Sequence, residues 1–149
     1  MMTSPDKPAK IEALIKQAEV CRLGINDGTT PYVVPLSFGY RDNTLYFHSG
    51  PKGKKLDLLK ENPDVCFEFD RVTKVMEAEN PCSWDIGYQS IIGTGKAEFL
   101  ETPEDKIKGL EAIVAQYSDR PMKIPESGVK NTVVFRVNIT GMAHKQNSV

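Results

Sequence analysis

The segment PYVVPLSFGYRDNTLYFHSGPKGKKLDLL, residues 31–59, contains two strand-like runs, a turn and the start of a helix. In residues 31–40 every second side chain is large and apolar or aromatic, which is the period of a β-strand with one buried face. Asp42-Asn43 predicts a turn, and residues 44–48 predict the next strand. A preceding run at residues 21–26 alternates in the same way, so we expect an antiparallel meander of three strands.

The rest of the chain predicts more strands, separated by a few helices. Further strands are expected at residues 64–71, 88–100 and 131–139, helices at residues 5–19, 53–61 and 102–117, and irregular structure at residues 73–85 and 118–130. Pro5 or Pro8 would open the first helix, and Gly93 and Gly95 indicate a bulge or a close approach by another group. Six strands joined mostly by turns are typical of a closed or nearly closed antiparallel barrel, a mainly β fold with flanking helices.

The composition is that of one ordinary globular domain. The chain has 149 residues, of which 40% are hydrophobic and 26% charged, with a formal net charge of -1. No overall field would attract nucleic acid or an anionic membrane, and no apolar run is long enough to span a bilayer. The N-terminus lacks the apolar core of a signal peptide, so we expect a cytoplasmic protein. Its three cysteines suit no metal site, and Cys21 and Cys66 fall in strand-like runs where reduced thiols pack well.

Residues 49–55, SGPKGKK, join a strand to a helix and concentrate positive charge there. A helix start has unpaired N–H groups and a partial positive charge, to which Lys52, Lys54 and Lys55 add full charges. Ser49 can donate a hydrogen bond, and the two glycines let a ligand approach the backbone. This pattern fits a phosphate seat, although not a P-loop, and the alternative is a solvated cluster of lysines.

Two residues next to this junction suggest a ligand-facing surface. Pro35 stands in the middle of a strand, where it removes a ladder donor, so it favours an edge strand or a backbone that faces a ligand. Val33 and Ser37 leave room beside it on the same face. His48, at the end of the next strand, either bonds a ligand or caps the strand in solvent.

Two longer stretches carry a resemblance to a known family. YVVPLSFGYRDNTLYFHSGPKGKKLDLLKENPDVCFEF, residues 32–69, and CSWDIGYQSIIGTGKAEFLETPEDK, residues 82–106, resemble the pyridoxamine 5′-phosphate oxidase-like family, in its nitroimidazole-resistance-type branch. The resemblance runs from about residue 15 to about residue 142, within a single domain of residues 1–149. It implies a six-stranded antiparallel split β-barrel that binds FMN, and a homodimer with two FMN sites at the subunit interface.

The resemblance also implies which residues contact the cofactor. Contacts along the flavin ring, mostly through the backbone, are expected from Val34, Pro35, Leu36 and Ser37, and contacts at the end of the next strand from Phe47 and His48. Lys54 and Lys55 match the basic pair that binds the phosphate. Ser90 matches a flavin contact often made from the partner chain, and Trp84 matches an aromatic residue that borders the pocket.

This sequence departs from the vitamin-oxidising members of the family in two places. Lys54 stands where those oxidases have an arginine, and NITGMAHKQNSV, residues 138–149, does not match their substrate-binding C-terminal stretch. We therefore do not expect oxidation of vitamin B6. Relatives bind haem or the deazaflavin F420, so the fold alone leaves the cofactor open.

Three classes of function are considered for this sequence. The first is an FMN-dependent oxidoreductase that reduces nitro-aromatic or similar small acceptors, with His48 as a candidate proton donor. The second is a non-catalytic flavin or haem carrier, for which Tyr46, His48 and His144 are the candidate haem ligands. The third, a nucleic-acid-binding barrel, is disfavoured by the slightly negative net charge and by aromatic residues that alternate toward a core.

Overall fold

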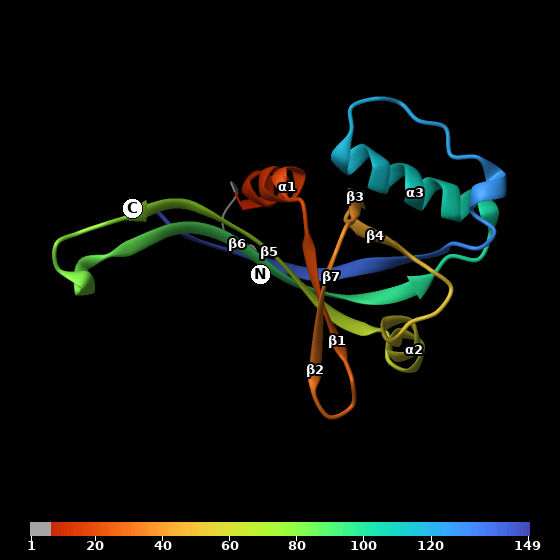
Figure 1. Cartoon of the computed structure of the whole chain (residues 1–149), viewed down its shortest axis with the longest axis horizontal. Coiled ribbons are helices and arrows are strands. Elements are labelled where there is room, and N and C mark those ends of the chain that lie inside the picture. Colours follow the sequence, from red (N-terminus) through yellow and green to blue (C-terminus); the bar gives the residue numbers. More distant parts are fainter. Residues whose placement is uncertain (1–6) are drawn as a thin grey trace.

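Seven strands form one antiparallel sheet in the order β2-β1-β5-β6-β7-β4-β3 in the computed structural model, which describes residues 7–149 (Figure 1). The strands are β1 (Cys21–Asn26), β2 (Pro31–Leu36), β3 (Gly39–Arg41), β4 (Thr44–Ser49), β5 (Asp64–Met76), β6 (Asp85–Phe99) and β7 (Val133–Asn147). The helices are α1 (Lys7–Gln17), α2 (Lys54–Glu61) and α3 (Pro103–Tyr117), with short 3-10 helices at Pro81–Ser83 and Glu126–Gly128. The mainly β class is confirmed. The predicted helix at residues 5–19 ends at Gln17, and Pro5 lies outside the described residues.

The predicted count of six strands is wrong, because the run at residues 31–40 breaks in two. Ser37 and Phe38 leave the sheet between β2 and β3. The Phe38 side chain is fully buried, 4.9 Å from the ring centroid of Phe69, and its backbone N–H donates to the Tyr117 hydroxyl at 3.2 Å. A side chain from a distant helix thus replaces the strand neighbour that Phe38 would otherwise need.

This break rolls the sheet into a split barrel. β2 pairs with β1 and β3 pairs with β4, as the meander predicted, yet β2 and β3 form opposite edges of the sheet. Only two residues separate these edges along the chain, so they must lie close in space. Among the described strands no ladder joins β2 to β4, and the barrel stays open there.

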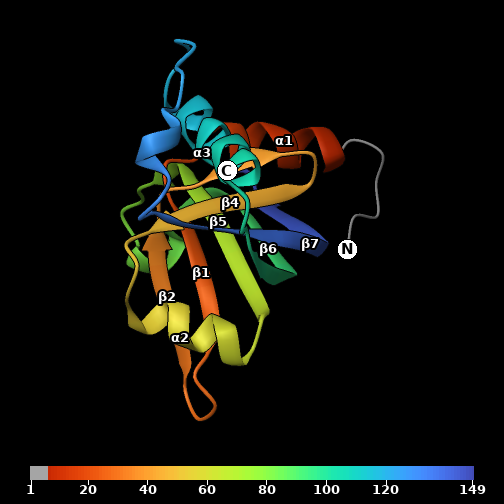
Figure 2. The ribbon, with the colours of Figure 1, turned by 90° about the vertical axis from the view of Figure 1, so that its right-hand side faces the viewer.

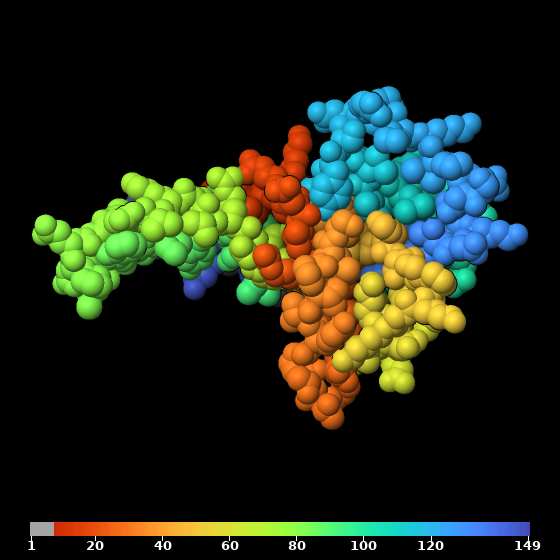
Figure 3. Space-filling model, viewed as in Figure 1, coloured from red at the N-terminus to blue at the C-terminus, as the bar shows by residue number. Residues whose placement is uncertain are grey.

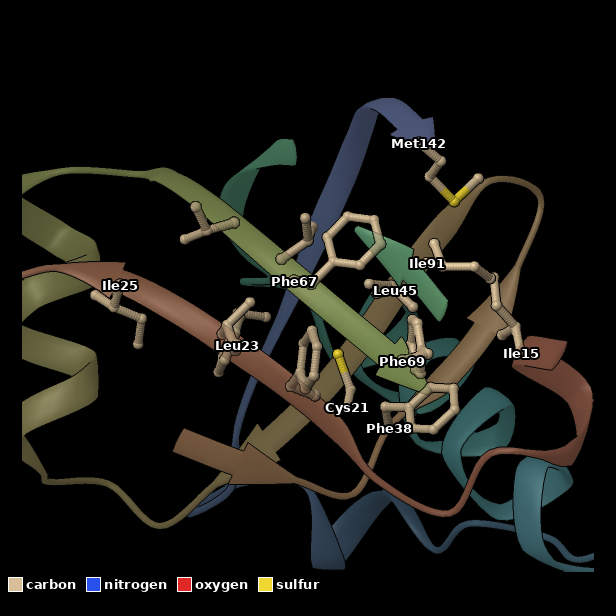
Figure 4. Close-up of a cluster of buried hydrophobic side chains, with 14 of the residues drawn as sticks. Ile15, Cys21, Leu23, Ile25, Phe38, Leu45, Phe67, Phe69, Ile91 and Met142 are labelled. Carbon is tan, nitrogen blue, oxygen red and sulfur yellow. The ribbon is translucent and has the colours of Figure 1, made fainter. Parts of the chain in front are cut away.

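Alternating side chains from the central strands fill the barrel, as the sequence predicted. The main inward residues are Cys21, Leu23 and Ile25 of β1 and Val65, Phe67 and Phe69 of β5 (Figure 4). Gly93 confirms the predicted close approach, because a Cβ there would lie 2.1 Å from the Phe67 ring. The β6–β7 register shifts between Thr94 and Gly95, which confirms the predicted bulge. Cys66 lies on the outer face of β5 and is exposed, whereas Cys21 is fully buried in the core.

An extended arm replaces the irregular structure predicted at residues 73–85. β5 continues to Met76, β6 begins at Asp85, and β7 runs on to Asn147, beyond the predicted end at residue 139. Figure 3 shows the arm projecting from the body of the molecule. The side chains from Arg71 to Glu77 are exposed on both faces, so they lack the alternation of a half-buried strand.

The helices sit at two ends of the barrel. α1 and α3 lie together at one end and α2 lies at the other (Figures 1 and 2). The Gln116 side chain of α3 donates to the carbonyls of Ile15 at 2.9 Å and Ala18 at 3.0 Å, which caps the end of α1. Thr102 caps α3 by accepting from the Asp105 N–H at 3.2 Å. None of the helices within residues 7–149 combines the length and apolar character needed to cross a bilayer.

Candidate functional site

The opening of the barrel is bordered by two unpaired strand edges. β2 is an edge strand, which confirms the prediction made from Pro35. β3 pairs only with Thr44, Leu45 and Tyr46, so the end of β4 at residues 47–49 has no neighbour on that side. Unpaired N–H and C=O groups along both edges are available to hydrogen-bond a flat polar ligand.

The start of α2 is a basic helix terminus without a side-chain cap. Gly53 occupies the N-cap with φ 155° and ψ 159°, a conformation that residues with side chains rarely adopt. Its carbonyl accepts from the Leu56 N–H at 3.2 Å, and as a glycine it has no side chain with which to cap the first N–H groups of the helix. The first N–H groups of α2 therefore add their partial positive charge to the lysines, which suits an anion such as a phosphate.

Lys54 ties this helix start to the β1–β2 hairpin. Its Nζ lies 3.3 Å from Asp27 Oδ2 and 4.4 Å from the centroid of the Tyr32 ring. The Lys54 side chain is 56% exposed, and an ion pair so open to solvent contributes little stability. A phosphate could therefore replace Asp27 at small cost. Lys55 is half-buried, so the two lysines have different surroundings.

The predicted flavin contacts on β2 and β4 divide by the face on which each side chain lies. Val34 and Leu36 are half-buried against the core, whereas Pro35 and Ser37 are exposed. Phe47 is fully buried and stacks on Phe135 with ring centroids 5.1 Å apart, so only its backbone is available to a ligand. His48 is exposed and Ser49 is half-buried.

Ser90 and Trp84 lie away from this opening within one chain. Ser90 lies in the middle of β6, opposite Asp70 on one side and Lys145 on the other. Trp84 lies in the hairpin at the end of the arm, where its side chain is half exposed and donates to the Ala78 carbonyl at 2.7 Å. The structure thus brings the start of α2 to the β1–β2 hairpin through Lys54, but it does not bring these two positions there.

The three candidate haem ligands do not converge. Tyr46 and His48 lie on β4, and His48 pairs with Val134 of β7. His144 is buried on β7, ten positions further along, which corresponds to about 30 Å of extended strand. Within residues 7–149, no three His, Cys, Asp or Glu side chains come together as a metal site.

A charged cluster on the outer face of the sheet was not predicted from the sequence. Arg22 Nη1 lies 3.4 Å from Glu68 Oε1 and 3.3 Å from Asp70 Oδ2. Burial raises the pKa of Glu68 to about 7, helped by a hydrogen bond and negative charge from Asp70 and opposed by Arg22. Because Phe67 and Phe69 point inward, the alternation along the strand predicts that Glu68 and Asp70 point outward. The strand register that places Arg22 between them could not be predicted from the sequence.

The chain and its split barrel match proteins of one known family. A family model described as pyridoxamine 5′-phosphate oxidase matches residues 7–146, and the chain belongs to that family. A proposed 5-nitroimidazole antibiotic resistance protein from Bacteroides thetaiotaomicron VPI-5482 shares 36% identity. The match covers 96% of this chain and 85% of that chain at a TM-score of 0.83, which confirms the predicted branch.

More distant structures share the fold. An FAD-binding protein from Mesorhizobium loti shares 25% identity over 98% of this chain and 96% of that chain, with a TM-score of 0.69. The flavocytochrome Anf3 from Azotobacter vinelandii has a TM-score of 0.80 over 95% of this chain and 67% of that chain. At 18% identity this second likeness concerns the fold alone. No curated protein showed significant similarity to the chain.

Proposed function

We propose that this chain is an FMN-dependent oxidoreductase that reduces nitro-aromatic or similar small acceptors. The observation that carries the proposal is the basic, uncapped start of α2 close to the edge strand β2, with Lys54 contacting both Asp27 and Tyr32 of the β1–β2 hairpin. Membership of the family and the 36% identity to a proposed nitroimidazole resistance protein support the same function. Bound FMN would supply the electron-transfer chemistry.

In this proposal two surfaces of the protein bind different parts of the FMN molecule. Lys54, Lys55 and the N–H groups of α2 hold the phosphate, with Ser49 as a further hydroxyl donor. The free edge of β2 at residues 34–36, together with Ser37 just after it, bonds the flavin ring through the backbone, and the end of β4 contributes to the same site. Pro35 limits the donors that this edge offers, so the ring meets carbonyls there.

The proposed protein is a homodimer with FMN at the subunit interface. Ser90 and Trp84 lie apart from the opening of their own barrel, so a second chain would have to bring such residues to it. The arm supports this arrangement, because it exposes Val72, Val75 and Ile86, each of them 45% or more accessible. Apolar residues gathered on one projecting hairpin are typical of a surface that is covered in the assembled protein.

The phosphate seat is tested by replacing both lysines with alanine. Each charge-assisted hydrogen bond contributes about 1.5–3 kcal/mol, so Lys54→Ala with Lys55→Ala should weaken FMN binding by about tenfold or more. Riboflavin, which lacks the phosphate, should lose little affinity. Lys60→Ala, in the last turn of the same helix, is the matched control and should leave both affinities unchanged. Equal losses for FMN and riboflavin would contradict the proposal.

His48 is the proposed proton donor to the acceptor, because it is exposed at the end of β4 beside the opening. His48→Ala should leave FMN bound and reducible, while reoxidation by a nitro-aromatic acceptor slows by about 10²-fold. If saturating FMN restores full turnover, His48 binds the cofactor instead and the proton-donor role is wrong.

The alternative is a non-catalytic flavin or haem carrier of the same fold, supported by the likeness in fold to the flavocytochrome Anf3. The separation of Tyr46 and His48 from His144 does not favour a shared haem pocket. An absorption spectrum of the purified protein separates these cases, since flavin bands support the proposal and a Soret band overturns it. Bound flavin that no acceptor reoxidises would indicate a carrier.

A further inference from the structure

The outer face of the sheet carries a row of residues that links two of the expected flavin contacts. Pro35 is opposite Arg22, and Arg22 is opposite Glu68. In the adjoining row Asp70 is directly opposite Ser90. Directly opposed residues in an antiparallel sheet lie on the same face, so the Arg22–Glu68–Asp70 cluster lies between Pro35 and Ser90.

The neighbours of Glu68 are mixed in polarity. Across β6 it faces Ile92, which is 61% exposed, and beyond Ile92 lies Ala143 of β7. The charged and titratable groups around it are Arg22 of β1, Asp70 of β5, Lys145 of β7 one row away, and the Cys21 thiol of β1 on the inner face. Two carboxylates thus share one guanidinium, which leaves the trio with a surplus negative charge unless one carboxyl keeps a proton.

We propose that Glu68 takes up a proton when the flavin is reduced and so offsets the charge that the electrons bring to the site. This inference rests on the proposed function, in which Pro35 contacts the flavin at the opening of its own barrel and Ser90 contacts the flavin at the partner's opening, so the cluster lies between the two flavin sites. Two electrons and one proton convert a neutral flavin ring into an anion, so one further proton keeps the charge of the site unchanged. The electrons come from a hydride donor such as a nicotinamide nucleotide, and the proton comes from solvent and forms an O–H bond on Glu68.

The chemistry of the cluster suits this role. The pKa of Glu68 is raised to about 7, so a small added negative charge nearby converts a partly ionised carboxylate into the acid. Arg22 holds both carboxylates in place whichever of them carries the proton. When an acceptor removes the electrons, the O–H bond breaks and the proton returns to solvent, which closes the cycle without any net change in Glu68.

The test measures the number of protons taken up per flavin reduced. Wild-type and Glu68→Gln proteins are loaded with FMN, and the midpoint potential is followed from pH 6 to pH 9. We expect the variant to take up fewer protons, by up to one, near and above pH 7. Glu98→Gln is the matched control, since hydrogen bonds from Asn138 and Arg136 already hold the pKa of Glu98 below its usual range. Equal proton uptake in wild type and Glu68→Gln would overturn the inference.

Two neighbouring variants keep the proposal testable if Glu68→Gln does not fold. Asp70→Asn removes a group that raises the pKa of Glu68, so the pH window of the extra proton should shift downward. Arg22→Gln removes a group that lowers that pKa, so the window should shift upward. Shifts in the same direction, or none, would contradict the role of Glu68. Protein that binds no FMN at all would instead refute the proposed function. An absorption spectrum recorded before the potential is measured shows whether FMN is bound.

Discussion

Both halves of the β5–β6 hairpin are antiparallel ladders, joined by a register shift between Val72 and Lys74, but their surroundings are opposite. In the barrel half, Val65, Phe67 and Phe69 of β5 are buried, and Ile91 of β6 is fully enclosed with them. In the arm half, Val72, Val75 and Ile86 are exposed although the ladder continues to the pair Met76 and Asp85. Pairing alone therefore does not bury a strand, and the arm gains its stability from its ladder rather than from packing.

This difference explains why the alternation of apolar and polar residues in the sequence predicts a strand in the barrel half but not in the arm half. A strand shows alternation when one face packs on a core, and the barrel half does so. The arm has no core of its own, so its apolar residues fall on no single face that the chain itself covers. We infer that the arm becomes fully stable only against another molecule, which the proposed dimer would provide.

The largest expected effect comes from removing a side chain of the barrel half. Phe67→Ala should lower the free energy of unfolding by about 3–5 kcal/mol, because the ring is buried and packs against Gly93. Val72→Ala in the arm, measured by the same denaturant titration on dilute protein, should change it by less than about 0.5 kcal/mol. Similar losses for both variants would break the contrast between the halves.

A second effect concerns assembly. Val75→Ser with Ile86→Ser removes two facing apolar side chains of the arm. If the arm contacts a second copy, the dissociation constant of the dimer should rise by about tenfold or more, since each such loss costs about 1 kcal/mol. Sedimentation equilibrium of the FMN-loaded protein measures this. Met122→Ser, at an exposed residue after α3, is the control and should leave the dimer intact.

A smaller effect is a pH dependence of stability that belongs to the barrel half. In the unfolded chain Glu68 titrates near pH 4.3, whereas in the folded protein its pKa is about 7. Between these values the folded state binds more protons, so raising the pH favours unfolding. The free energy of unfolding should therefore fall more steeply from pH 5 to pH 7.5 in wild type than in Glu68→Gln. Parallel curves would show that the pKa of Glu68 is not raised.

The smallest effect is expected from a surface ion pair at the far end of the barrel half. Lys96 Nζ lies 2.7 Å from Asp64 Oδ1, but the two side chains are 64% and 67% exposed. Solvent screens such a pair, so Lys96→Met should change the free energy of unfolding by no more than about 0.5 kcal/mol. A loss above about 1 kcal/mol in a denaturant titration would show that this ion pair stabilises the folded state more than its exposure to solvent implies.

Local chemistry made much of the fold predictable. The Asp42-Asn43 turn has φ 52° and 57°, as two-residue hairpin turns require, and Asn62 ends α2 before Pro63. The break at Ser37 and Phe38 was not predictable, because it depends on Tyr117, 79 positions away. Local patterns carry no record of such a contact, and the run at residues 31–40 therefore looked like one strand.

The candidate site, like the fold, was predictable only in part. The basic helix start and the edge position of Pro35 follow from residues adjacent in sequence, so they were predictable. The Arg22–Glu68–Asp70 cluster depends on the β1–β5 register, which strand patterns do not specify. The positions of Ser90 and Trp84 relative to a flavin need a second chain, and their roles stay predictions.

The place of β7 in the sheet has a consequence for how the chain folds. β7 lies between β6 and β4, so the ladder that connects β4 to the rest of the sheet needs the last strand of the protein. The contact between Phe38 and Tyr117 likewise waits for α3. During synthesis β4 would therefore lack its second strand neighbour, β7, until nearly the whole chain has left the ribosome. We expect slow closure dominated by long-range contacts, and truncations that remove β7 to leave β3 and β4 without a sheet to join.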